Sequence, residues 1–285
     1  MADAPTVGGA LVAARTRLRD AGVATAALDA RLLLAHVLDL TPTGLIVAEV
    51  SPIAPGDAAR IEAAIVRRVA GEPVGRIIGR RSFFGLELAL SPETLEPRPD
   101  TETLVQAVLD WAGDRDRPLT IVDVGTGTGA ILLALLAALP NATGLGTDIS
   151  PGAVATAVRN AHGTGVADRA RFCVCDAASA AHGPVDVLVS NPPYIPSRDI
   201  AGLDREVREH DPRMALDGGP DGLAFYRRLA GAASGLVSPA GAVMVEFGIG
   251  QAESVADIFR AAHLGRLEIL PDLEARPRVL RAEWQ

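Results

Sequence analysis

The chain has 285 residues, 48% hydrophobic and 22% charged, which suits a globular protein with one large domain or a medium domain and a small one. All 27 basic residues are arginine, and without lysine the chain can form neither a Gly-Lys-Ser/Thr phosphate loop nor a Schiff base. The net charge of −8 argues against a partner held through many phosphate contacts, so we expect no direct binding of nucleic acid.

The first 75 residues contain patterns typical of helices only. The spacing of apolar residues predicts helices over residues 7–21, 26–40 and 55–70, with a short turn near 43–48. The apolar residues of the second helix fall on one broad face, which a helix packed in a small bundle needs. We therefore predict that residues 1–75 form an N-terminal helical domain.

A different pattern begins at Arg76 and predicts a hairpin linker over residues 76–98. Gly85 divides two apolar runs, and in the second run leucines alternate with other residues at period two, as in a strand. A proline-rich loop follows and ends at Asp100, which we predict to be the N-cap of a helix reaching about Trp111.

From residue 99 to 285 the chain alternates between strand and helix patterns. Strands are predicted over residues 119–125, 142–149, 171–177, 185–191, 241–247, 264–270 and 277–284, and helices from Ala130, Pro151, Leu223 and Ala252. This alternation predicts a parallel sheet wrapped by helices. Too few residues separate the last two strands for a crossover, so these strands should form an antiparallel pair at one end of the sheet.

Two other residue types carry little functional indication. Cys173 and Cys175 would share one face of the third predicted strand, where we expect them to be small core residues. The five histidines do not have the spacing of metal ligands, and we expect no metal site.

The acidic start of the chain is unlike a signal peptide, and the longest apolar run, residues 130–139, is too short for a membrane span. We therefore expect a cytoplasmic protein that does not bind membranes.

A glycine-rich loop follows the first predicted strand of the sheet and precedes a helix. Gly125, Gly127 and Gly129 permit a tight turn and let a ligand approach the backbone closely. Asp148 ends the next strand, nineteen residues after Gly129, where a carboxylate can accept both hydroxyls of a ribose, and Asp176 ends the third strand in the same way. These features predict a site for a cofactor that contains a nucleoside.

The loop by itself leaves two cofactors open. Gly125, Gly127 and Ala130 satisfy the dinucleotide fingerprint, so NAD is compatible with this loop. Asp123 favours S-adenosylmethionine, because its carboxylate precedes the loop and could contact a cationic amino-acid tail, and no later segment suggests hydride transfer.

The fourth predicted strand runs directly into Asn191-Pro192-Pro193-Tyr194. The two prolines stiffen the backbone and remove two donors, so the carbonyls of Asn191 and Pro192 can act as rigid acceptors. An asparagine oxygen, a carbonyl oxygen and an aromatic face together suit a planar NH₂ group. Such a site would direct a weakly nucleophilic amide or amino nitrogen towards a methyl donor, with orientation supplying most of the catalysis.

These motifs resemble those of a known family. DVGTGTGAI, TDIS and NPPYIP are similar to class I S-adenosylmethionine-dependent methyltransferases that methylate amino groups, and EPRPDTETLV, VEFGIGQ, PDLEARPRVL and the acidic extension after NPPY resemble the release factor glutamine methyltransferases (PrmC or HemK family). The similarity covers nearly the whole chain. It implies an α/β, Rossmann-like fold with a seven-stranded, mostly parallel sheet, the small helical bundle and the hairpin linker.

The resemblance also implies an activity and its residues. The reaction would be methylation of the side-chain amide nitrogen, N5, of the glutamine in the Gly-Gly-Gln motif of class I peptide chain release factors, with the N-terminal domain docking the release factor. The implied cofactor-binding residues are Gly125, Thr126, Gly127, Thr128, Gly129, Asp148, Asp176, Ala177 and Asn191. The implied substrate-binding residues are Asn191, Pro192, Pro193 and Tyr194, which are also catalytic, with Phe83 and Phe84 covering the substrate and Arg98 and Glu246 shaping the pocket.

Two positions depart from the family pattern. Glu96 replaces a common isoleucine, and Ala177 stands where an aromatic residue often follows the acid, so the surface for stacking the adenine must come from another residue or be weaker.

Two other functions compete with this one. An N6-adenine methyltransferase acting on DNA or RNA could use the same tetrapeptide but would need a basic groove, and a non-catalytic cofactor-binding protein would not need the tetrapeptide.

Overall fold

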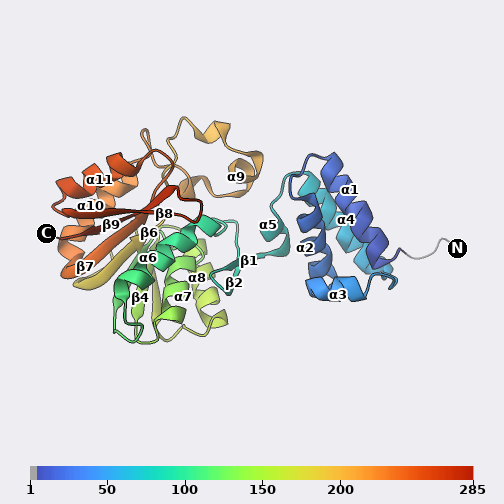
Figure 1. Ribbon diagram of the computed structural model, residues 1–285, viewed down its shortest axis with the longest axis horizontal. Helices are drawn as coiled ribbons and strands as arrows, with labels where there is room; N and C mark the ends of the chain where they lie inside the picture. The colour runs from blue at the N-terminus through green and yellow to red at the C-terminus, as the bar shows by residue number, and fades with distance from the viewer. Residues whose placement is uncertain (1–4, 285) are drawn as a thin grey trace. The chain divides into compact units, whose positions relative to one another are not determined.

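The structure of the protein is a computed structural model that describes residues 5–284. It divides into two compact units, Met1–Gly79 and Arg80–Gln285 (Figure 1). Each unit buries its own apolar residues: one hydrophobic cluster lies in the first unit and two lie in the second. No helix among residues 5–284 has the length and apolar character needed to cross a membrane.

The first unit is helical, as predicted. Its helices are α1 (Val7–Asp20), α2 (Ala26–Leu38), α3 (Pro42–Val47), α4 (Pro55–Val69) and α5 (Val74–Ile78). Leu33 and Leu34 of α2 are fully buried, because α2 packs against α1, α3 and α4. Thr6 caps α1 by accepting a hydrogen bond from the amide of Gly9 at 3.2 Å.

The hairpin starts later than the sequence predicts, because residues 76–78 belong to α5 rather than to a strand. Pro73 precedes this helix, and Gly79 ends it in the left-handed conformation with φ of 79°. The hairpin itself consists of β1 (Arg80–Phe83) and β2 (Leu86–Ala89), which pair antiparallel. Phe84 and Gly85 form its turn, and both have positive φ.

The second unit is built on a seven-stranded sheet, which confirms the predicted fold class. Its strands are β3 (Thr120–Val124), β4 (Thr143–Asp148), β5 (Ala170–Val174), β6 (Val185–Ser190), β7 (Val237–Glu246), β8 (Arg266–Pro271) and β9 (Pro277–Glu283), in the order β5-β4-β3-β6-β7-β9-β8. Only β9 runs antiparallel to its neighbours, and β8 and β9 form the expected antiparallel pair at one end. The strand order reverses between β3 and β6, and ligands of open α/β sheets bind at such a switch point.

Helices cover both faces of this sheet (Figure 1). The main helices are α6 (Glu102–Ala112), α7 (Ala130–Ala138), α8 (Pro151–Gly163), α10 (Ala224–Leu236) and α11 (Ala252–Ala261). Apolar residues of α6, α7 and α8 pack on the face that includes Ile121, whereas α10 and α11 pack on the face that includes Val122. Because neighbouring residues of a strand point to opposite faces, a strand buried on both faces must be apolar at nearly every position.

Two predictions about single residues are wrong. Asp100 is not the N-cap of α6, because it lies inside a 3-10 turn, η1 (Pro99–Thr101), and its carboxylate pairs with Arg278. Cys175 is not in the same strand as Cys173, because β5 ends at Val174, and both thiols are half-buried rather than in the core.

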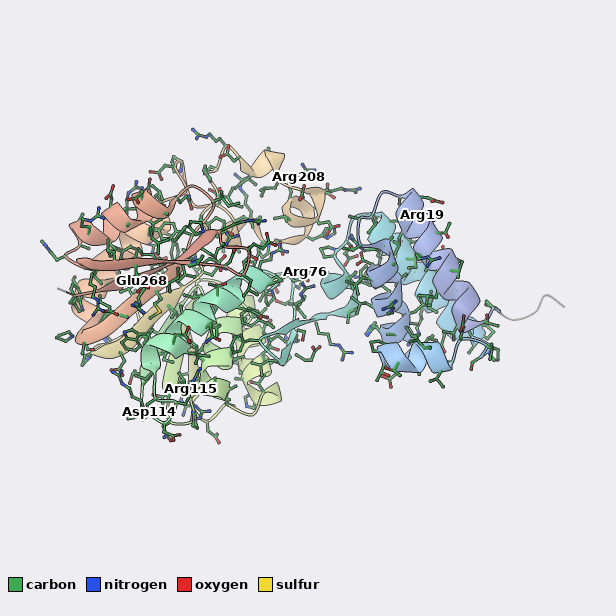
Figure 2. The ribbon with its side chains drawn as sticks, in the orientation of Figure 1. Arg19, Arg76, Asp114, Arg115, Arg208 and Glu268 are labelled. Carbon is green, nitrogen blue, oxygen red and sulfur yellow. The ribbon has the colours of Figure 1, made fainter. Side chains whose placement is uncertain are left out.

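The segment between β6 and α10 also contains short elements that the sequence did not predict. They are η2 (Ile200–Gly202), α9 (Arg205–His210) and η3 (Arg213–Ala215). Figure 2 shows Arg208 on α9, and the carboxylate of Glu209 pairs there with both Arg205 and Arg208. Asp217 pairs in the same way with Arg213, so these two carboxylates are balanced by neighbouring arginines.

Candidate functional site

The glycine loop links β3 to α7 in a backbone conformation that glycine adopts readily. Gly125, Gly127 and Gly129 all have positive φ, at 74°, 54° and 81°. The amides of Gly125 and Thr126 donate to the carbonyl of Thr147 at 2.8 and 2.9 Å, which ties the loop to β4. These hydrogen bonds hold the glycine loop against the end of β4.

Asp148 ends β4 beside this loop. Its Oδ2 accepts a hydrogen bond from the amide of Gly127 at 2.9 Å, and its Oδ1 accepts one from the amide of Ser150 at 2.9 Å. An ionised carboxylate has about four acceptor positions, so each oxygen retains a lone pair for a ligand hydroxyl. The side chain is therefore oriented by the protein and still able to bind a ribose.

Asp123 lies behind the loop rather than in the ligand cavity. It is fully buried, and its Oδ2 accepts a hydrogen bond from the hydroxyl of Thr126 at 2.6 Å, whereas its Oδ1 has no hydrogen-bond partner. Burial raises the pKa of this carboxyl to about 7, and the hydrogen bond from Thr126 opposes that rise. Asp123 therefore positions Thr126 through this hydrogen bond. It does not line the cavity, whereas contact with the cationic tail of a cofactor would require it to do so.

A cavity of about 660 Å³ lies at this end of the sheet in the second unit. It is lined by ten of the predicted site residues: Arg98, Gly125, Thr126, Gly127, Thr128, Asp148, Asp176, Ala177, Asn191 and Pro193. The volume falls in the range of pockets for small molecules and cofactors. Gly129, Pro192 and Tyr194 belong to the same segments but do not line the cavity.

Asn191 and the residues after it continue directly from β6. Because β3 and β6 are paired neighbours, with Asp123 opposite Val189, the glycine loop and Asn191 emerge side by side. The Nδ2 of Asn191 donates to the hydroxyl oxygen of Thr101 at 3.0 Å. Among residues 5–284 no donor is hydrogen-bonded to the Oδ1 of Asn191 or to the main-chain carbonyls of Asn191 and Pro192. The side-chain oxygen of Asn191 is therefore available as an acceptor.

Tyr194 is fixed on the other side of this segment. Its carbonyl accepts a hydrogen bond from Nε2 of Gln251 at 2.9 Å, and a Cβ at Gly248 would lie 2.9 Å from its ring. Burial raises the pKa of the Tyr194 phenol to about 12, so the ring is neutral near pH 7.

Phe225 and Arg228 of α10 also line the cavity, and sequence reasoning missed both. Arg228 forms an ion pair with Asp176 at 2.5 Å, and its guanidinium lies 5.4 Å from the centre of the Phe225 ring. Arg228 therefore links the ring of Phe225 to Asp176 at the end of β5.

The four remaining predicted residues lie in different surroundings. Phe83 is 1% exposed, lies in the hydrophobic core of the second unit and does not line the cavity, so its ring is not available to cover a ligand there. Phe84 is half-buried, and its amide donates to Oε1 of Glu102 at 2.9 Å. Arg98 lines the cavity and pairs with Asp211 at 2.5 Å. Glu246, at the end of β7, is 1% exposed and lies outside the lining.

Glu96, the departure from the common isoleucine, has a structural explanation. Its side chain is buried, and Oε1 pairs with Arg81 at 3.2 Å, so the charge at this position is balanced by a residue of β1. No group of three or more histidine, cysteine, aspartate or glutamate side chains in residues 5–284 is arranged to hold a metal ion.

The residues of the cavity fit S-adenosylmethionine. The glycine loop admits a ligand close to the backbone, because a Cβ at Gly125 or Gly127 would have no heavy atom within 4 Å, and Asp148 can bind ribose hydroxyls. The cavity is also wide enough to bring such a cofactor next to Asn191.

Comparison with known proteins identifies the family. Residues 9–79 match the family model of the PrmC N-terminal domain, and residues 121–210 match that of a methyltransferase domain. The release factor glutamine methyltransferase of Rhodospirillum rubrum is 52% identical over 269 residues, covering 93% of this chain and 81% of the relative. The enzyme of the same name from Bradyrhizobium diazoefficiens is 48% identical and covers 91% of this chain and 90% of the relative.

Solved structures agree at the level of the fold. The N-terminal domain of human METTL16 in complex with SAH has a TM-score of 0.53 and 16% identity, covering 89% of this chain and 94% of that one. At this identity the likeness shows a shared class I methyltransferase fold and carries no information about the substrate. The sequence relatives carry the narrower conclusion: this chain belongs to the family of release factor glutamine methyltransferases.

Proposed function

We propose that the protein transfers a methyl group from S-adenosylmethionine to N5 of the glutamine in the Gly-Gly-Gln motif of class I peptide chain release factors. The observation that carries this proposal is the placement of Asn191 beside the glycine loop, in one cavity, with its side-chain oxygen free to accept a hydrogen bond. When bound, the cofactor supplies an electrophilic methyl group on a sulfonium.

The glycine loop and the strand-end acids would hold the cofactor. Gly125 to Gly129 allow close approach to the backbone, Asp148 accepts the ribose hydroxyls, and Asp176 and Ala177 lie towards the adenine. Phe225, which lies under Arg228 and lines the same cavity, would supply the aromatic surface for adenine stacking that Ala177 lacks.

The Asn191 to Tyr194 segment would hold the glutamine amide. The Oδ1 of Asn191, which lines the cavity, would accept one amide hydrogen. The family resemblance assigns the second hydrogen to the carbonyl of Pro192 and support of the amide plane to Tyr194, two residues that adjoin the lining. Amide nitrogen is a poor nucleophile because its lone pair is delocalised, so correct orientation has to supply most of the rate. The new N–CH₃ bond would replace the S–CH₃ bond of the cofactor, and the amide nitrogen would lose one proton.

The helical first unit would dock the release factor. It has a hydrophobic cluster separate from those of the second unit, and every residue that lines the cavity belongs to the second unit. A separate folded unit that adds nothing to the cofactor cavity is free to recognise a protein substrate.

An N6-adenine methyltransferase is the main competing function, because an adenine amino group fits the same acceptors. Nucleic acid, however, binds to surfaces with an excess of basic residues, and this chain carries a net charge of −8. The arginines of α9 are paired with Glu209, so they do not form an unbalanced basic surface.

The decisive experiment compares three acceptors with isotopically labelled S-adenosylmethionine: a release factor, the same factor with the motif glutamine changed to alanine, and duplex DNA. We expect label only on the unchanged release factor. Label on DNA, or label that persists on the alanine variant, would contradict the proposal.

A matched pair of variants tests the amide-binding role of Asn191. Asn191→Ala should lower the rate of methyl transfer by about 100-fold or more, because it removes an acceptor that orients the nucleophile. Its dissociation constant for the cofactor should change by less than about threefold. Asn141→Ala, which removes an exposed asparagine far along the sheet, serves as the control and should retain full turnover. Near-normal turnover of Asn191→Ala would rule out the amide-binding mechanism.

A further inference from the structure

The side chain of Gln251 links the segment from Asn191 to Tyr194 to the interior of the sheet. Its Nε2 donates to the carbonyl of Tyr194 at 2.9 Å, and its Oε1 accepts a hydrogen bond from the amide of Gly248 at 2.9 Å. Gly248 comes two residues after the end of β7, and the second half of this strand is buried and lies between β6 and β9. Through Gln251, the rigid end of β7 therefore supports the main chain at Tyr194.

The partners of Gln251 leave its amide group a single orientation. A main-chain carbonyl can only accept a hydrogen bond, and a main-chain N–H can only donate one. The NH₂ of Gln251 must therefore face Tyr194, and its oxygen must face Gly248. None of these three groups titrates, so the arrangement does not depend on pH.

Gln251 is also the N-cap residue of α11, but its side chain does not cap the helix. Serine, threonine, aspartate and asparagine are preferred at this position because their short side chains accept a hydrogen bond from the first turn. The N-caps of α1, α3 and α8, which are Thr6, Thr41 and Ser150, do accept such a bond. Helix stability therefore does not explain a glutamine at position 251, whereas its hydrogen bond to Tyr194 does.

The peptide group between Tyr194 and Ile195 is held at both ends. The amide of Ile195 donates to the carbonyl of Leu216 at 3.0 Å, and Gln251 binds the carbonyl of Tyr194. Gly222, with φ of 76°, lies against the same carbonyl, where a Cβ would clash with the oxygen and lie 2.8 Å from Nε2 of Gln251. A peptide plane held in this way limits the directions in which the side chain of Tyr194 can point.

We propose that Gln251 is a positioning residue: by holding the carbonyl of Tyr194, it keeps the ring of Tyr194 where the ring supports the amide plane of the substrate glutamine. The inference rests on the proposed function, which assigns that support to Tyr194. Gln251 does not line the cavity, so it acts through Tyr194 and not by contact with cofactor or substrate. Because orientation supplies most of the rate for a weakly nucleophilic amide, loss of this support should lower kcat.

Gln251→Ser separates positioning from helix stability, because serine is a favoured N-cap but is too short to reach Tyr194. The melting temperature should stay within about 2 °C of wild type, since the new cap offsets the lost hydrogen bonds. In contrast, kcat for the release factor should fall by about tenfold. The dissociation constant for S-adenosylmethionine should change by less than about threefold, because the residue lies outside the cavity lining.

Gln251→Glu isolates the contact with Tyr194. A carboxylate still accepts a hydrogen bond from the amide of Gly248, but it has no donor for the carbonyl of Tyr194, and the two oxygens repel each other. Its kcat should fall at least as far as that of Gln251→Ser. Gln106→Ser is the matched control, since Gln106 is exposed on α6, where its Nε2 donates to Asp110 at 2.7 Å, and this variant should retain full turnover.

A spectroscopic measurement reports on Tyr194 directly. The sequence contains two tyrosines, Tyr194 and Tyr226, so ¹⁹F spectra of protein labelled with 3-fluorotyrosine show these two rings alone, and Tyr194→Phe assigns them. In Gln251→Ser and Gln251→Glu the signal of Tyr194 should shift or broaden, and that of Tyr226 should not change. Tyr226 is the internal reference, because it is fully buried and its hydroxyl donates to the carbonyl of Glu246 at 2.9 Å.

The outcomes separate the positioning role from the proposed function. If wild type does not methylate the release factor, the proposed function fails, whatever the ¹⁹F spectra show. If wild type is active and Gln251→Ser keeps kcat within about threefold, or loses kcat while the Tyr194 signal stays unchanged, the positioning role is overturned. It is also overturned if kcat, cofactor affinity and melting temperature fall in parallel, because that pattern indicates general destabilisation.

Discussion

At the scale of single residues, the most unusual feature of the site is the fully buried carboxyl of Asp123. Its pKa is raised to about 7, mainly by burial, and the nearby Asp148 adds to the rise. The folded state therefore binds a proton between about pH 4 and pH 7 that the unfolded state, with an ordinary aspartate pKa, does not bind. Linkage then requires that stability falls as pH rises through this window.

Asp123→Asn should remove this part of the pH dependence. Between pH 5 and pH 8 the melting temperature of the ligand-free wild type should fall by roughly 5 °C more than that of the variant, because the variant has no charge to bury. Glu246 has the same sign of effect, but it is present in both proteins and cancels in the difference. Equal slopes for the two proteins in a calorimetric pH series would show that Asp123 ionises normally.

Phe225 supports a second prediction at this scale. Phe225 lines the same cavity as Ala177, and its ring lies under the guanidinium of Arg228. Phe225→Ala should raise the dissociation constant for S-adenosylmethionine by about 5- to 10-fold, as expected for the loss of one aromatic stacking contact. Phe225→Tyr keeps the aromatic face and should bind within twofold of wild type in calorimetric titration. Unchanged affinity in Phe225→Ala would mean that the adenine stacks elsewhere.

At the scale of elements, the close packing of α7 on β4 determines how the glycine loop is supported. Every residue of α7 from Ala130 to Leu136 is buried, and a Cβ at Gly144 of β4 would lie 2.3 Å from Cδ1 of Leu132. The helix that begins at the loop therefore sits directly on the strand that ends at Asp148, and glycine is what permits this approach.

Gly144→Ala should destabilise the protein by about 1–3 kcal/mol, the usual cost of inserting a methyl group into a packed core. Gly231→Ala is the matched control, because it lies in the interior of α10 with no atom within 4 Å of a new Cβ. It should stabilise the protein by about 0.5–1 kcal/mol through the better helix propensity of alanine. Urea unfolding of both variants measures the contrast, and a neutral Gly144→Ala would show that α7 can shift freely.

At the scale of the whole molecule, the proposed function assigns binding of the cofactor and recognition of the protein substrate to different units. The apolar clusters do not cross the division at Gly79, and the residues that line the cavity all come from Arg80–Gln285. The second unit contains the complete sheet and both of its packed faces, so it has the core of an independent domain.

A fragment comprising residues 80–285 should therefore bind S-adenosylmethionine within about threefold of the full chain. Its kcat/KM for a release factor should fall at least about tenfold, because the proposed docking unit is missing. Circular dichroism first establishes that the fragment is folded. A folded fragment that methylates the release factor as well as the full chain would refute the docking role of the first unit.

The sequence by itself determined the order and type of most elements, the glycine loop and the tetrapeptide of Asn191, together with the family resemblance. These features depend on residues close together in the chain: apolar periodicity, glycines at fixed spacing, and prolines that stiffen the segment after β6. Even locally, however, the signals were incomplete, since α5 and α9 consist of only a few residues each and gave no periodic pattern.

Only the tertiary structure decided which distant side chains meet at the site. Thr101 reaches Asn191 across 90 positions of the chain, and Arg228 of α10 pairs with Asp176, which follows β5. It also decided that Asp123 and Phe83 are buried and do not line the cavity. The physical reason is that such contacts depend on the strand order and on which face each helix covers. Neither is encoded in the spacing of residues along one segment; both arise when the sheet reverses its order between β3 and β6 and brings their carboxyl ends together.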